Sequence, residues 1–256
     1  MTRPRIRLGT LALAALVAIA PAPVRAWTPR TRVEIADEAV RMMPPSLRLA
    51  LERQRDELLR GTLEPMAREN DPAHRPPWND GTLDAEIESR ASSLVRTVDA
   101  AASFREVARA FGALAHFVED AAYPPGAAGR EGSPRYAEFG DYLESRRPKF
   151  PLVFYGHEDG DLARGDFRAF ALREMGKARQ EYANLARVYE TAGDPPDPAA
   201  FDDRSIPFAV ASLSYSRTVT LVVRAWLAAW KLAHGDLGRT PYLASPAPGA
   251  GPERNP

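Results

Sequence analysis

Residues 103–125 read SFREVARAFGALAHFVEDAAYPP and carry the clearest structural signal in the chain. Ser103 followed three residues later by Glu106 has the form of a capping box, which marks the start of a helix. Apolar residues then recur every three or four positions, as on one buried helix face: Val107, Ala110, Phe111, Leu114, Phe117, Val118 and Ala121. Pro124 and Pro125 should end the helix, because proline does not fit a helix interior.

The same spacing recurs along most of the chain, and no convincing alternating strand pattern is present. The sequence therefore predicts an all-α fold in a single domain of about seven helices. The expected helices lie near residues 35–43, 46–61, 82–100, 103–123, 136–144, 166–192 and 205–233. The last is apolar on most sides, which predicts a central buried helix. Arg224 and Lys231 interrupt it and argue against a membrane span.

Residues 62–81 contain four prolines and end in Gly81, which is too many breakers for one regular element. We expect a long loop here. Long loops inside a compact domain are more often functional than idle. Residues 126–165 are also expected to be rich in loops.

The first 26 residues resemble a secretory signal peptide. Arg3, Arg5 and Arg7 precede an apolar run of residues 8–20, and the small residues Val24 and Ala26 suit a signal peptidase. Cleavage after Ala26 would leave residue 27 at the mature N-terminus, in the periplasm or outside the cell. The alternative is an uncleaved membrane anchor, but the run is shorter than the roughly 20 residues that a spanning helix needs.

Composition limits the kinds of partner. Removing residues 1–26 takes away four arginines and no acidic residue, which leaves 30 basic and 34 acidic side chains and a net charge of −4. Such a chain has no strong overall attraction for nucleic acid or anionic membranes. It has no cysteine, so disulfides and thiolate metal sites are excluded. We expect residues 27–240 to form one monomeric domain, and the Pro- and Gly-rich residues 241–256 to be disordered.

His116 and Asp120 lie four residues apart on the helix expected at 103–123. This spacing places the imidazole and the carboxylate side by side on one helix face, where they could share a cation. Taken alone, such a pair is more often a hydrogen-bonded pair at the surface.

Two segments nevertheless resemble the zinc-dependent phospholipase C and single-strand nuclease family. Residues 112–124, GALAHFVEDAAYP, are similar to the central helix of that family, in which His-x-x-x-Asp supplies two zinc ligands. Residues 27–39, WTPRTRVEIADEA, are similar to the family's mature N-terminus, in which a Trp binds zinc through its amine and carbonyl oxygen. The resemblance implies that Trp27 is a metal ligand, that zinc is the cofactor, and that phosphodiesters such as phospholipids are the substrates.

Several of the family's other ligands are replaced. Where the family has a histidine in its first helix, this chain has Arg32, and Gly126, Tyr136 and Gly140 stand at three further ligand positions. An arginine can pair with a carboxylate in place of a metal ion, since it is always charged. We therefore expect Arg32 to reach Asp120 or Asp71 as a cation replacement; the alternative is an exposed Arg32.

The ligands that remain would surround one ion. The resemblance implies a set of Asp71, His74, His116 and Asp120, with Asp71 also accepting the proton from the attacking water. Zinc accepts such oxygen and nitrogen ligands. The alternative is a buried polar network without metal.

Two functions follow from this interpretation. The first is an exported phospholipase C-like protein with an eroded metal site, at most one zinc ion and weak or no phosphodiester hydrolysis, in effect a pseudoenzyme. The second is a non-catalytic binding or structural protein on the same scaffold. Clustered cations stabilise phosphoryl transfer, so the loss of ligands favours low activity.

Overall fold

The computed structural model describes residues 27–132, 136–191 and 201–243. Within these ranges the chain forms ten α-helices and no strand, so the all-α prediction is confirmed. The α-helices are α1 (Pro29–Arg41), α2 (Pro45–Arg53), α3 (Arg55–Leu63), α4 (Leu83–Asp99), α5 (Phe104–Ala122), α6 (Pro124–Ala128), α7 (Tyr136–Arg146), α8 (Gly160–Ala163), α9 (Phe167–Thr191) and α10 (Ile206–Leu232). Short 3₁₀ helices cover Glu64–Arg68, Pro72–His74, Pro77–Asn79, Gly129–Glu131 and Arg147–Lys149.

The helix count exceeds the predicted seven for local reasons. The helix expected at 46–61 is divided at Gln54 into α2 and α3, and α3 continues past the expected stop at Gly61 to Leu63. The short helices α6 and α8 lie in stretches that were expected to be irregular. Neither the break at Gln54 nor the short helices α6 and α8 have an apolar periodicity from which the sequence could have predicted them. The loop at 62–81 is present and contains three 3₁₀ helices.

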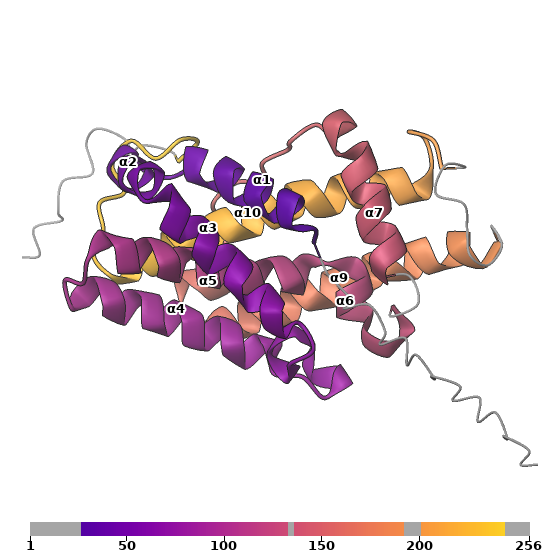
Figure 1. The fold of residues 1–256 in the computed structure, drawn as a ribbon, viewed down its shortest axis with the longest axis horizontal. Coiled ribbons are helices and arrows are strands. Elements are labelled where there is room, and N and C mark those ends of the chain that lie inside the picture. Colours follow the sequence, from indigo (N-terminus) through magenta and orange to yellow (C-terminus); the bar gives the residue numbers. More distant parts are fainter. Residues whose placement is uncertain (1–26, 133–135, 192–200, 244–256) are drawn as a thin grey trace, which may run out of the picture.

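Helix α5 begins and packs as its sequence predicts. The Ser103 side chain accepts from the Glu106 N–H, and the Ser103 N–H donates to the Glu106 carboxylate, which together form the capping box. The helix packs against α3, α4, α9 and α10, so it lies at the centre of the bundle. In Figure 1, α4 and α5 run side by side, while α9 and α10, the two longest helices of the described ranges, extend along the long axis.

Helix α10 is the one helix of the described ranges that is long and apolar enough to cross a membrane. Its most apolar window is 72% buried inside the fold, however. It also contributes the fully buried Tyr215, Val222 and Trp226 to the main core. The helix is therefore accounted for as a core helix of the bundle.

Candidate metal centre

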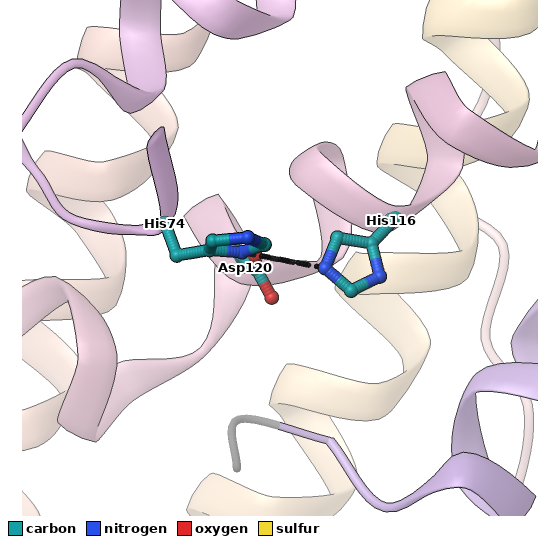
Figure 2. Close-up of side chains that lie close together, drawn as sticks. All are labelled: His74, His116 and Asp120. Carbon is teal, nitrogen blue, oxygen red and sulfur yellow. Dashed lines mark hydrogen bonds and ion pairs between the residues drawn. The ribbon is translucent and has the colours of Figure 1, made fainter. Parts of the chain in front are cut away.

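Three side chains that could bind a metal ion meet where the long loop crosses α5. His116 and Asp120 come from successive turns of α5, and His74 comes from the end of the Pro72–His74 turn. One ligand atom from each lies within 4.8 Å of those of the other two. Figure 2 shows the carboxylate of Asp120 against the ring of His74, with the ring of His116 facing them from the right. The side chain of His116 is fully buried, and those of His74 and Asp120 are only 7% and 4% exposed.

The distances within this cluster fit one tetrahedral ion. His116 Nε2 lies 3.4 Å from Asp120 Oδ2 and 3.4 Å from His74 Nδ1. Ligand atoms on a tetrahedral zinc ion are about 3.3 Å apart, since each bond is about 2 Å long. The third distance, from His74 Nδ1 to Asp120 Oδ2, is 2.7 Å. That is a hydrogen bond, so an ion would have to displace a proton there, as metals do when they bind histidine.

A backbone contact orients the ring of His116. Its Nδ1 lies 2.7 Å from the carbonyl oxygen of Thr62, at the end of α3. A carbonyl oxygen can only accept a hydrogen bond, so Nδ1 carries the ring proton and Nε2 presents its lone pair to Asp120 and His74. Metal-binding histidines usually have such an outer partner.

The other side of Asp120 is bound to a fully buried arginine on α1. Arg32 Nη2 donates to Asp120 Oδ1 at 2.5 Å, and Nη1 donates to Glu119 Oε2 at 2.7 Å and to the carbonyl oxygen of His116 at 3.2 Å. The contact between Arg32 and Asp120 that the sequence leads us to expect is therefore present, and the exposed alternative is wrong. Glu119 was not predicted from the sequence, although a glutamate on the apolar face of a buried helix was a usable signal.

Burial and neighbouring charges determine the protonation states of Glu119, Asp120 and His116. Burial raises the pKa of Glu119 to about 8, because Arg32 offsets the loss of solvation only in part. Burial acts on Asp120 in the same direction, but Arg32 and the histidines outweigh it and hold the pKa of Asp120 well below its usual range. Burial lowers the pKa of His116, and the charge of Arg32 lowers it further. At neutral pH, Asp120 is thus ionised and His116 is neutral, which are the metal-binding forms.

Asp71, the fourth side chain of the predicted set, lies outside the cluster. Asp71 is exposed and has extended backbone angles just before the Pro72–His74 turn, so the turn directs His74 but not Asp71 to the cluster. The expected four-ligand set is therefore reduced to three among the described residues. Trp27 is buried; its indole Nε1 donates to the carbonyl oxygen of Glu119 at 2.8 Å, and its ring packs edge-on against Tyr123.

A groove of about 600 Å³ opens beside His74. Its lining includes Ala110, Ala113 and Phe117 of α5, together with Asp71. The charged side chains that line it are of both signs, four acidic and three basic: Glu64, Asp71, Glu86, Glu106, Arg68, Arg90 and Arg109. Two of the three arginines are paired, Arg90 with Glu86 at 2.6 Å and Arg109 with Glu64 at 2.5 Å. The groove therefore lacks the continuous positive charge that a nucleic-acid backbone requires.

Solved structures that share this fold include two clostridial toxins. The alpha-toxin of Clostridium perfringens avian strain SWCP is 14% identical with a TM-score of 0.58, and the match covers 80% of this chain and 64% of the toxin. The alpha toxin of Clostridium absonum is 15% identical with a TM-score of 0.58, covering 84% of this chain and 65% of the toxin. The chain thus spans just under two thirds of the length of each toxin.

At this identity the matches establish the fold alone. They confirm the predicted all-helical fold of the zinc-dependent phospholipase C type. In sequence, no known protein family and no curated protein matches the chain.

Proposed function

We propose that this protein is a diverged phospholipase C-like scaffold that binds one zinc ion through His74, His116 and Asp120. The observation that carries the proposal is the division of Asp120 between two environments. Its Oδ2 atom faces the two imidazoles, and its Oδ1 atom is bound by Arg32. The first side offers a site for one ion. On the second side, the permanent charge of the guanidinium would repel a further cation.

This arrangement supports weak or no phosphodiester hydrolysis. When bound, zinc supplies Lewis-acid stabilisation of phosphate charge, but a single ion lacks the neighbours that share this charge in clustered sites. Asp71 lines the same groove and would accept the proton of the attacking water. The mixed charge and apolar lining of the groove favour a small amphiphilic ligand, such as a phospholipid, over a polynucleotide.

The second candidate is a non-catalytic binding or structural protein. It is favoured by the hydrogen bond between His74 and Asp120 at 2.7 Å, which satisfies both groups without an ion. On this proposal the three side chains form a closed polar network, and the groove binds its ligand without turnover.

Metal content separates the two proposals. The protein is refolded with zinc, dialysed, and its metal-to-chain ratio is measured by native mass spectrometry, alongside hydrolysis of bis-p-nitrophenyl phosphate. One ion per chain with little hydrolysis is the expected result. Zero ions would favour the non-catalytic protein, and two or more with turnover would restore a full hydrolase.

We also propose that the protein is exported and that Trp27 becomes its first residue. The basis is the arginine-rich, then apolar, stretch of residues 1–26. N-terminal sequencing of the protein from the periplasm or the medium should begin at Trp27. A start further along the chain, or retention of residues 1–26, would contradict this.

A further inference from the structure

Helices α3 and α5 cross in close backbone contact beside the candidate metal centre. A Cβ atom added at Gly112 would overlap the carbonyl oxygen of Leu58 and lie 2.7 Å from the Thr62 nitrogen. A Cβ added at Gly61 would overlap the carbonyl oxygen of Arg109 and lie 3.0 Å from the Ala113 nitrogen. Atoms this close cannot coexist, and the opposing atoms belong to the backbone rather than to flexible side chains. The two helices can approach this closely only with glycine at both positions.

The crossing lies next to the residue that orients the imidazole. Thr62 follows Gly61 directly, and Gly112 precedes His116 by one helical turn. The contact between the Thr62 carbonyl oxygen and His116 Nδ1 is 2.7 Å long and buried. A side chain at either glycine would push α3 away from α5, and the carbonyl would move with it. A separation greater by about 1 Å would break this hydrogen bond, since such bonds weaken steeply beyond about 3.2 Å.

We infer that Gly61 and Gly112 are positioning residues for the metal centre. Their close contact brings the Thr62 carbonyl to His116, and this carbonyl selects the ring tautomer that is protonated at Nδ1 and bare at Nε2. The bare nitrogen then faces Asp120 Oδ2 and His74 Nδ1, each 3.4 Å away. The zinc part of this inference rests on the proposed function, whereas the tautomer part does not.

The tautomer can be read in the metal-free protein. Long-range ¹H–¹⁵N NMR of the histidine rings distinguishes protonated from bare nitrogens. His116 in the wild-type protein should be protonated at Nδ1 and bare at Nε2, with assignment by comparison with a His116→Gln variant. A wild-type ring protonated at Nε2 overturns the inference, whatever the protein does with zinc.

Alanine variants test the role of the crossing. Gly112→Ala and Gly61→Ala should reduce the fraction of the Nδ1-protonated tautomer and weaken zinc binding about 10- to 100-fold, the usual effect of losing an outer partner of a metal-bound histidine. Gly176→Ala is the matched control, since Gly176 also lies within a helix, α9, and a Cβ there meets nothing within 4 Å. It should leave both readouts unchanged.

The outcomes separate the two proposals. A folded Gly112→Ala variant with the wild-type tautomer and zinc affinity overturns the inference. If both alanine variants unfold, the tautomer of His116 in the wild-type protein alone decides the inference. If the wild-type protein binds no zinc, the proposed function fails, and the tautomers of the wild-type and variant proteins still decide the role of the glycines.

Discussion

The two carboxylate oxygens of Asp120 face opposite kinds of surroundings within one buried site. Oδ2 faces ring nitrogens of His74 and His116, and both of these nitrogens are atoms that a metal ion can bind. Oδ1 faces Arg32, whose charge cannot be removed or exchanged. The comparison shows how one buried carboxylate can be paired on both sides: Arg32, a fixed cation, occupies the Oδ1 side, and the Oδ2 side remains exchangeable between a hydrogen bond and a metal ion.

Removing the charge of Asp120 should have the largest effect, because both sides depend on it. In Asp120→Asn, Arg32 loses a partner while it stays fully buried, and breaking a buried pair typically costs about 3–5 kcal/mol. Urea unfolding should show a loss of this size, and zinc binding should disappear. Asp37→Asn is the control, since its pair with Arg55 lies at the surface, and it should lose less than about 1 kcal/mol. Equal losses in the two variants would contradict the account of the site.

His74→Ala should disable the exchangeable side alone. Zinc affinity should fall by at least about a hundredfold, because losing a ligand costs no less than losing an outer partner. The stability of the metal-free protein should change far less than in Asp120→Asn, since Arg32 and Asp120 remain paired. His157→Ala is the control, because His157 contacts the carbonyl oxygen of Pro241 and lies outside the cluster. Isothermal titration with zinc measures both variants, and similar affinities would contradict the proposed ligand set.

Glu119→Gln should change how the stability of the protein depends on pH, and it therefore tests the side of the site that Arg32 occupies. The pKa of Glu119 is raised to about 8 in the folded protein, against about 4.3 when unfolded. Between these values the unfolded chain releases a proton that the folded chain holds. This group therefore makes stability fall as pH rises, by at most about 1.4 kcal/mol per unit.

Glutamine resembles the protonated form and cannot titrate, so the variant should show a flatter stability profile between pH 5 and 8. Urea unfolding across this range measures the slope, with the exposed Glu52→Gln as control. A slope identical to that of the wild-type protein would mean that Glu119 is ionised throughout.

Much of the fold was predictable because helix periodicity and capping are local. The capping box at Ser103 and the apolar face of α5 identified the central helix, and the i, i+4 spacing placed His116 beside Asp120. The path of the loop was not predictable in this way, because no periodicity constrains its backbone. His74 reaches the cluster while Asp71, three residues earlier, does not. The contact of the Thr62 carbonyl and the close crossing at the two glycines also lack a sequence signal. The first contact is made by a backbone atom, and the crossing depends on the absence of a side chain.

Arg32→His should convert part of the fixed side into a metal-binding side. A free imidazole is mostly uncharged at pH 7.5, so the variant removes the fixed charge of the guanidinium and frees Asp120 Oδ1. Zinc should then bind about tenfold more tightly, equivalent to about 1.4 kcal/mol. Without metal the variant should be less stable than the wild-type protein, because its buried carboxylate loses its cation, and zinc should restore part of the difference. Arg32→Gln separates the two causes, since it removes the charge and adds no imidazole nitrogen. If the glutamine variant gains as much affinity as the histidine variant, repulsion by the guanidinium was the whole effect. If neither gains, Arg32 does not stand in for a metal ion, and its pairing with Asp120 serves only to stabilise the fold.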